Sequence, residues 1–156
     1  MRRRKAEQRE PIADPKFSSR LLSKFINTIM ENGKKTVAEG IVYGALDILE
    51  QKTQETNVIK VFNKAIENVR PKLEVKARRI GGATYQVPIE VPSGRANSLA
   101  IRWLRDFART KKGRPMDVKL ADELLAAYKG EGAAVKKRDD THKMAEANKA
   151  FSHLRW

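Results

Sequence analysis

The sequence contains no cysteine, only two histidines and few aromatic residues among its 156 positions. Without thiols the chain can form neither a disulfide framework nor a thiolate metal site, which favours a cytoplasmic protein. His142 and His153 are eleven residues apart, which does not match the spacing of zinc ligands. We therefore expect no metal and no other cofactor.

A long apolar run is also missing. The first residues, Met1-Arg2-Arg3-Arg4-Lys5, are charged like the start of a signal peptide, but Ala6 to Pro15 is mostly polar. No segment approaches the roughly 20 apolar residues that a membrane-spanning helix needs. The sequence thus argues against export and predicts no membrane partner.

Basic charge is what the chain has in excess. It carries 33 Lys and Arg against 19 Asp and Glu, a formal net charge of +14. Residues 70–114 hold twelve basic and three acidic side chains, net +9, whereas residues 21–69 hold six of each. Residues 1–20 add +4 and residues 129–156 add +3. This distribution predicts a neutral scaffold that presents basic segments to a polyanion.

Apolar residues recur at helical spacing in the first third of the chain. Ser18 or Ser19 can cap a first helix, which we expect to end at Gly33. Thr36-Val-Ala-Glu39 has the pattern of a capping box and predicts the start of a second helix, with Val37 on its inner side. Asn57 is the expected cap of a third helix.

Helical spacing returns in the last third. A fourth helix is expected after Ser93-Gly94, and a fifth begins near Pro115 and ends at Gly130. A sixth runs from about Ala133 into residues 144–147. Together with the first three helices, these segments predict one mainly α domain over residues 1–156, with a basic N-terminal extension at 1–17 and a C-terminal tail at 149–156.

The hydrophobic period changes from 3.6 to 2 between residues 72 and 91. Apolar and polar residues alternate on both sides of Gly81-Gly82, which predicts a two-stranded β-hairpin arm inserted into the helical fold. Lys76, Arg78 and Arg79 lie on or beside it. Charge can protect an edge strand, but small glycines flanked by cations also allow close approach to a sugar–phosphate chain. We interpret the arm as a nucleic-acid contact.

Two further patterns suggest chemistry but lack its context. Gly33-Lys34-Lys35-Thr36 resembles the end of a phosphate-binding loop, yet Thr28 stands where the upstream glycine belongs and a helix precedes it. His142 follows Asp139 and Asp140, but nothing fixes a nucleophile near it. We interpret the first as an exposed turn between helices and expect no enzymatic activity.

Four stretches carry a family resemblance. They are Asp14-Pro15-Lys16-Phe17 with Asn32-Gly33-Lys34-Lys35; Glu67-Asn68-Val69-Arg70-Pro71 with Glu74-Val75-Lys76-Ala77-Arg78-Arg79-Ile80-Gly81-Gly82-Ala83-Thr84-Tyr85-Gln86-Val87-Pro88; Ala100-Ile101-Arg102-Trp103; and Ala134-Val135-Lys136-Lys137-Arg138 with His142-Lys143-Met144-Ala145-Glu146 and Arg155-Trp156. On these residues the chain resembles bacterial-type small-subunit ribosomal protein seven, a family of rRNA-binding proteins of the small-subunit head. The resemblance covers essentially the whole chain.

The resemblance implies a structural constituent of the small ribosomal subunit that binds the 3′ major domain of 16S rRNA and nucleates assembly of the head. It places the arm near the exit-site tRNA and the mRNA exit path, and it implies neighbouring head and platform proteins as partners. Some relatives repress translation of their own mRNA, which makes that role a hypothesis for this chain.

The resemblance also implies RNA contact by the arm and by the N-terminal residues, to which we add the other basic groups. The candidate RNA-binding residues are Arg2, Arg3, Arg4, Lys5, Lys34, Lys35, Lys76, Arg78, Arg79, Gly81, Gly82, Arg95, Arg102, Arg109, Lys111, Lys112, Arg114, Lys136, Lys137, Arg138 and Lys143. Ser93-Gly94-Arg95 departs from the family pattern, because many relatives carry two or more basic residues there.

Two alternatives remain open at this point. A sequence-indifferent DNA-binding protein would also use a basic two-stranded arm, and it would prefer duplex DNA to rRNA in a competition titration. An RNA-modifying enzyme would need a cofactor motif, a metal site or a general base, none of which the sequence supplies. Turnover abolished by His142→Ala would favour the enzyme.

Overall fold

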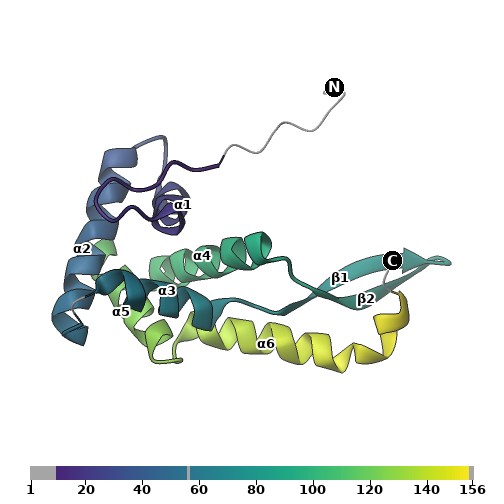
Figure 1. Ribbon diagram of the computed structural model, residues 1–156. Helices are drawn as coiled ribbons and strands as arrows, with labels where there is room; N and C mark the ends of the chain where they lie inside the picture. The colour runs from purple at the N-terminus through teal and green to yellow at the C-terminus, as the bar shows by residue number, and fades with distance from the viewer. Residues whose placement is uncertain (1–9, 56, 155–156) are drawn as a thin grey trace, which may run out of the picture.

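The computed structural model describes residues 10–55 and 57–154. Their elements follow in the order α1 (Arg20–Ile29), α2 (Lys35–Thr53), α3 (Val58–Val69), β1 (Leu73–Ile80), β2 (Ala83–Glu90), α4 (Ser93–Thr110), α5 (Met116–Tyr128), α6 (Ala133–Ala147) and the 3₁₀ helix η1 (Lys149–Leu154). The predicted mainly α fold with one inserted hairpin is confirmed. Figure 1 shows α1, α2, α3 and α5 gathered at one end, with the hairpin projecting away from them and α6 running beside it.

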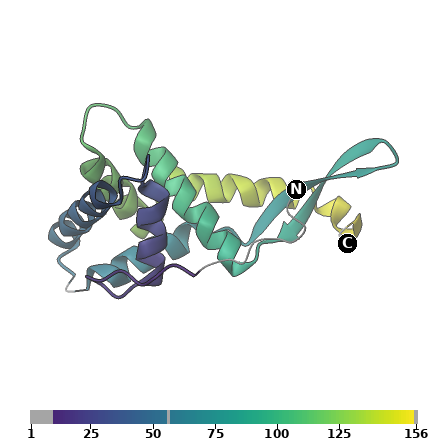
Figure 2. The ribbon, with the colours of Figure 1, turned by 90° about the horizontal axis from the view of Figure 1, so that it is seen from above.

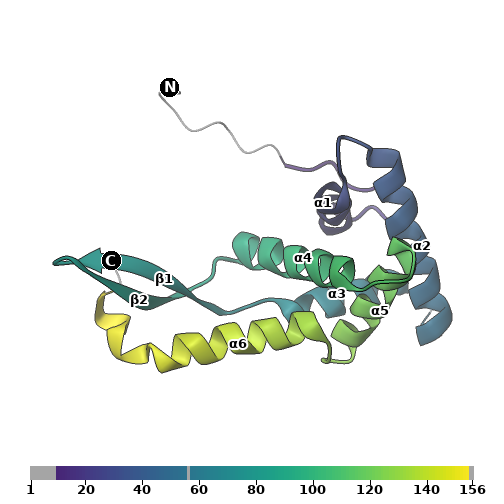
Figure 3. The same cartoon turned by 180° about the vertical axis from the view of Figure 1, so that it is seen from behind.

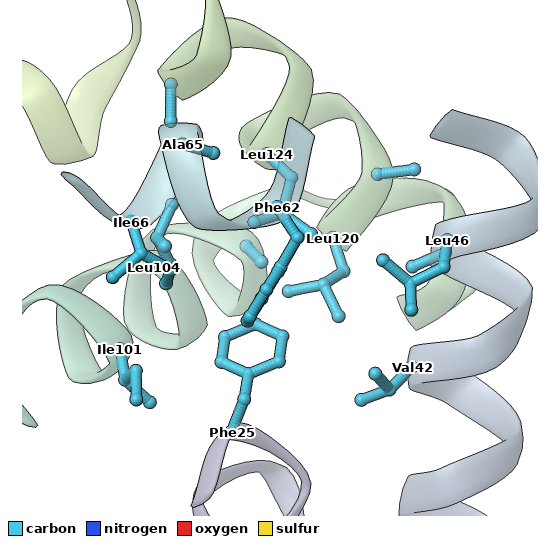
Figure 4. Packing of buried hydrophobic residues seen from close by; sticks show 14 of the residues in the cluster. Phe25, Val42, Leu46, Phe62, Ala65, Ile66, Ile101, Leu104, Leu120 and Leu124 are labelled. Carbon is cyan, nitrogen blue, oxygen red and sulfur yellow. The ribbon is translucent and has the colours of Figure 1, made fainter. Parts of the chain in front are cut away.

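The core lies where the six α helices of the described residues meet. Phe25 of α1 and Phe62 of α3 are fully buried, and their rings pack edge to face with centroids 5.3 Å apart. Side chains of α2, α4 and α5 surround this pair (Figure 4), including Leu46, Leu104 and Leu120. Burying one such side chain contributes about 1.5–3 kcal/mol. The helical spacing seen in the sequence therefore marks the faces that form this core.

Side-chain caps begin two of the helices as predicted. The Ser19 hydroxyl accepts a hydrogen bond from the Leu22 N–H at 3.3 Å, and the Asn57 side chain accepts one from the Lys60 N–H at 3.2 Å. Pro115 directly precedes α5, which therefore begins where predicted. Each side-chain oxygen satisfies an N–H that the helix itself leaves without a partner.

The turn between α1 and α2 differs from the prediction. α1 ends at Ile29, four residues before Gly33, because Asn32 and Gly33 both have positive φ and reverse the chain. Their turn is complete at Lys34, which precedes the first residue of α2.

The predicted capping box at the start of α2 is consequently wrong. Thr36 already lies inside the helix, and no side chain caps its N-terminus. The Glu39 carboxylate instead lies 3.6 Å from the Lys35 amine, within the same helix. Val37, predicted to face inward, is 56% exposed.

Part of the predicted N-terminal extension is packed against the scaffold. Asp14 is buried, and its carboxylate accepts hydrogen bonds from the Lys16 and Phe17 N–H groups and, at 2.6 Å, from the Tyr43 hydroxyl of α2. Burial and this hydrogen bond raise the pKa of Tyr43 to about 12. The chain is thus attached to α2 from residue 14 onward.

The register of the hairpin places the alternating apolar residues of β1 on one face of the ribbon and those of β2 on the other face. Lys76 pairs with Val87 and Arg78 with Tyr85, so these four side chains share one face of the ribbon. Arg79 lies on the other face. Gly81 and Gly82 have φ of +55° and +89°, the positive values expected for the tight turn. Both faces of the arm therefore mix apolar and charged side chains.

The last helix supports the arm along its length. The Arg138 guanidinium donates to the Asn68 carbonyl at the end of α3, and His142 Nε2 accepts a hydrogen bond from the Lys72 N–H at 2.9 Å. Farther out, the ring of Phe151 in η1 packs on Tyr85 of β2 with centroids 5.4 Å apart. Figures 2 and 3 show α6 and η1 extending from the bundle beside the ribbon. A two-stranded ribbon is marginally stable alone, so this support positions it.

A buried carboxylate fixes the start of α6. Glu123 of α5 is 2% exposed, and its two oxygens contact the Ala134 N–H at 3.1 Å and the Lys111 amine at 2.8 Å. Gly132, with φ of +96°, lets the chain enter α6 closely: a Cβ there would lie 2.9 Å from the Ala126 Cβ. This contact joins the α4–α5 loop, α5 and α6.

We predict that Glu123→Ala lowers the free energy of unfolding by about 2–3 kcal/mol, because it removes hydrogen bonds to a charged group and leaves Lys111 without its partner. Urea unfolding followed by circular dichroism measures the change. Glu131→Ala, an exposed carboxylate in the next turn, is the matched control and should change the stability by less than about 0.5 kcal/mol. Equal effects of the two substitutions would contradict the assigned role.

Candidate RNA-binding surface

The arm presents its cations and its turn to solvent. Lys76 and Arg79 are exposed, Arg78 is half-buried, and both glycines of the turn are exposed. A Cβ at Gly81 or Gly82 would meet nothing within 4 Å, so the positive φ, and not crowding, calls for glycine. The backbone of the turn is therefore open to a close-fitting ligand.

A stripe of arginines runs along α4, starting at the end of the helix that lies near the arm. Arg95, Arg102 and Arg109 are spaced by seven residues, two helical turns, and so lie on one side of the helix. Arg95 Nε donates to the Glu74 carboxylate of β1 at 2.7 Å, which ties the start of α4 to the arm. At the other end, Arg109 contacts Glu31 at 2.6 Å and donates to the Ile29 carbonyl.

The stripe continues to the α1–α2 turn. Arg109 and Lys34 line the same groove of about 440 Å³, whose other walls include Val37 and Met116. The structure thus brings together predicted residues from three parts of the sequence: the arm, α4 and the α1–α2 turn. We call this the basic path; it consists of Lys34, Lys76, Arg79, Arg95, Arg102 and Arg109.

Several other predicted RNA-binding residues are engaged within the protein, as Arg95 and Arg109 of the basic path also are. Lys111 pairs with buried Glu123, and Arg138 pairs with Asp139 and donates to the Asn68 carbonyl. Arg114 lies 3.1 Å from Asp122, which Lys52 also contacts at 2.7 Å. The Lys52 hydrogen bond is the main reason that the pKa of Asp122 lies below its ordinary value.

Other predicted cations form no ion pair with any residue in the described ranges. They are exposed and comprise Lys34, Lys76, Arg79, Arg102, Lys112, Lys136, Lys137 and Lys143. The last three lie on α6, apart from the α4 stripe. The predicted contacts Arg2, Arg3, Arg4 and Lys5 lie outside the described residues.

The described residues give no support for catalytic or metal chemistry. His142 Nε2 is occupied by the Lys72 N–H, so it is not available as a base in this arrangement. Within residues 10–55 and 57–154, no three His, Cys, Asp or Glu side chains are placed to hold a metal ion. No helix in the same ranges is long and apolar enough to cross a membrane.

A helical scaffold with exposed cations on a projecting ribbon and along an adjoining helix is the architecture of a polyanion-binding protein. Residues 1–149 match the family model described as ribosomal protein S7p/S5e. The chain belongs to this family of ribosomal proteins. Membership confirms the predicted family and agrees with the expectation that the chain is not an enzyme.

Similar proteins come from several bacteria. The chain is 58% identical over all 156 residues of both sequences to small ribosomal subunit protein uS7 of Thermotoga maritima, and 60% identical over the same length to that of Fervidobacterium nodosum. It is 59% identical to the protein of the same name from Methylococcus capsulatus over 155 residues, 99% of each chain. The similarity therefore includes the arm, α4 and α6.

We predict a loss of stability at mildly acidic pH. Burial, with help from the Arg138 guanidinium and Lys72, lowers the pKa of His142 below its ordinary value of 6.5, and its Nε2 must be unprotonated to accept the Lys72 N–H. Because the unfolded chain binds the proton more readily, this contribution is present above pH 6.5 and is lost as the pH falls through the lower pKa of the folded state.

Urea unfolding at about pH 7.5 and about pH 5.5 tests the predicted loss of stability. Both pH values lie above the range in which most carboxyl groups titrate. His142→Gln should reduce the difference between the two pH values, whereas His153→Gln, on η1, should leave it as in the unsubstituted protein. A pH dependence that persists in full after His142→Gln would assign it to other groups.

Proposed function

We propose that the chain binds small-subunit rRNA as a structural constituent of the cytoplasmic ribosome, at the 3′ major domain of 16S rRNA, where it nucleates assembly of the head. The observation that carries this proposal is the basic path, which joins the arm to the α1–α2 turn on a protein of a ribosomal family. RNA contact by phosphates along this path would fix the orientation of the protein on the folded RNA.

The form of the path favours a folded RNA over a simple duplex. The arm projects from the bundle, while α4 runs back into the bundle at a wide angle to the ribbon (Figure 2), so a path along both elements does not follow one straight line. A rigid rod of DNA follows such a surface only if it bends, at a cost in deformation energy. A folded rRNA domain offers phosphates in several directions. Sequence-indifferent DNA binding is therefore the second candidate function.

The finer parts of the proposal follow from the family resemblance. The arm would lie near the exit-site tRNA and the mRNA exit path, and neighbouring proteins of the head and platform would contact the remaining surface. Repression of its own mRNA would use the same cations, because an mRNA that imitates the rRNA site competes for the same path.

A competition titration tests the proposal. The full chain should bind a transcript of the 3′ major domain, and its affinity should fall with salt with a slope of about −0.9 for each duplex phosphate neutralised. A random RNA of equal length and a duplex DNA of equal length are the competitors. Equal competition by the random RNA would contradict specific rRNA binding, and stronger competition by the DNA would favour the architectural alternative.

We further predict that substitutions of the arm cations change RNA binding, whereas substitution of an internal cation changes stability. Lys76→Ala with Arg79→Ala should weaken RNA binding and reduce the steepness of the salt slope by about two, because each residue neutralises about one phosphate. Thermal unfolding should change little, since exposed charges contribute little to stability. The contrasting variant Lys111→Ala should lower the unfolding temperature, because it leaves buried Glu123 without its cation.

Titrations at several salt concentrations, together with calorimetry of each variant, measure both properties. A large loss of thermal stability in the arm variant, or RNA binding equal to that of the unsubstituted protein, would contradict the assignment of the arm cations to RNA.

A further inference from the structure

The base of the arm is held from two sides. On the side of α6, His142 accepts the Lys72 N–H, and on the side of α4, Arg95 donates to the Glu74 carboxylate of β1. In Figure 1 the base of the ribbon runs between the start of α4 and α6. The sheet of the described residues has two strands, which are marginally stable alone. The angle between the arm and the bundle therefore depends on side-chain contacts of this kind.

The Glu74–Arg95 ion pair combines a shielded carboxylate with an exposed guanidinium. The Glu74 side chain is 16% exposed, whereas that of Arg95 is 57% exposed. The pair at the other end of the α4 stripe is the reverse, because Glu31 is 68% exposed and Arg109 is 37% exposed. Salt screens a partly buried charge less than an exposed one. The pair at the base of the arm is thus the less screened of the two.

This ion pair uses only part of the guanidinium. The contact, at 2.7 Å, is made by Nε, which carries one of the five N–H groups of an arginine. The hydrogen bond to Glu74 and the charge of that carboxylate raise the pKa of Arg95 above its ordinary value, so the guanidinium stays charged. The other N–H groups belong to a side chain that is more than half exposed, and such groups bind phosphate well. Arg95 can therefore join the arm to α4 and contact RNA at the same time.

The charge of Glu74 is unfavourable for RNA binding. The ion pair has no net charge, and the carboxylate repels a phosphate that approaches Arg95. A surface that served only to attract polyanions would bind them better with a neutral side chain at this position. What the carboxylate adds is restriction, because a long side chain that is already held loses less conformational freedom when it binds. The position of Glu74 thus indicates a role in orientation.

We propose that Glu74 is a positioning residue for RNA recognition, which acts through Arg95 to fix the arm relative to α4. The arm cations and the α4 arginines then accept phosphates at one spacing. A folded RNA with that spacing contacts both groups at once, whereas another RNA contacts one group or must deform. Glu74 therefore contributes to the preference for one RNA and not to affinity for RNA in general. This inference rests on the proposed rRNA binding and deepens it.

The positioning role is tested on the protein without RNA. Because the chain contains no cysteine, Thr84→Cys in the arm and Thr110→Cys at the end of α4 can be spin-labelled without removal of other thiols. Pulsed electron paramagnetic resonance measures the distribution of distances between the two labels. It should be broader when Glu74→Gln or Arg95→Gln is added to the labelled protein. Equal distributions in all three proteins would overturn the positioning role.

The recognition role is tested by comparing affinity for the 3′ major domain transcript with affinity for a random RNA of equal length. If Glu74 acted by charge alone, Glu74→Gln would strengthen binding to both RNAs to the same extent. We expect instead that it lowers the preference for the rRNA transcript by about 2- to 12-fold, the range for immobilising one long side chain. A preference equal to that of the unsubstituted protein would overturn the proposal.

Glu146→Gln is the matched control for charge. Glu146 is exposed, forms no ion pair with any described residue and lines a depression with Lys72 at the base of the arm. Its substitution removes the same charge without changing the partner of Arg95. Both the label distances and the preference for the rRNA transcript should stay as in the unsubstituted protein.

A double variant tests whether Glu74 acts through Arg95. In a protein that already carries Arg95→Gln, the further substitution Glu74→Gln should lower the preference no more, because the pair is already broken. A full additional loss would contradict this route.

Failure of the unsubstituted protein to prefer the rRNA transcript over random RNA would instead overturn the proposed function. The label distances are measured without RNA, so they test the ion pair whatever the result with RNA. The failure of this inference and the failure of the proposed function are therefore distinguishable.

Discussion

The shape of this protein depends on the contacts of one buried carboxylate, that of Glu123. It receives the first turn of α6 on one oxygen and the Lys111 amine on the other, at distances of 3.1 and 2.8 Å. A buried charge is tolerated only when it is paired, so the loop after α4 and the start of α6 are both constrained by it. The direction of α6 then determines where His142 and Phe151 meet the ribbon. The projecting arm is thus positioned from inside the bundle.

The basic residues of the chain serve two purposes that its net charge does not distinguish. Lys111 and Arg138 complete internal contacts, whereas Lys76 and Arg102 form no ion pair with the described residues and face solvent. The internal cations hold the elements that present the external ones. A ligand that neutralised the internal cations would have to disrupt the fold, whereas one that neutralises the external cations changes the folding stability little. Affinity and stability are therefore largely separate properties of this chain.

Much of the fold could be predicted from sequence because local physics decides it: Ser19 and Asn57 cap helices, and Gly81-Gly82 makes the turn of the arm. The capping box at Thr36 failed because the positive φ of two preceding residues moved the helix start. The site was predictable only in part. Lys111 and Lys112 are equivalent in the sequence, yet only the first lies opposite a buried carboxylate, since that depends on the packing of α5.

The register of the hairpin also affects the protein before it meets any ligand. Five of the eight cross-strand pairs join an apolar residue to a polar or charged one, as Leu73 with Glu90 and Lys76 with Val87. Neither face of the ribbon is therefore a continuous apolar sheet surface. A projecting two-stranded ribbon with apolar faces would otherwise be a template for self-association, and charged side chains on both faces oppose such stacking. The cross-strand pairing of apolar with polar residues thus favours solubility of the free protein in the interval between its synthesis and its assembly.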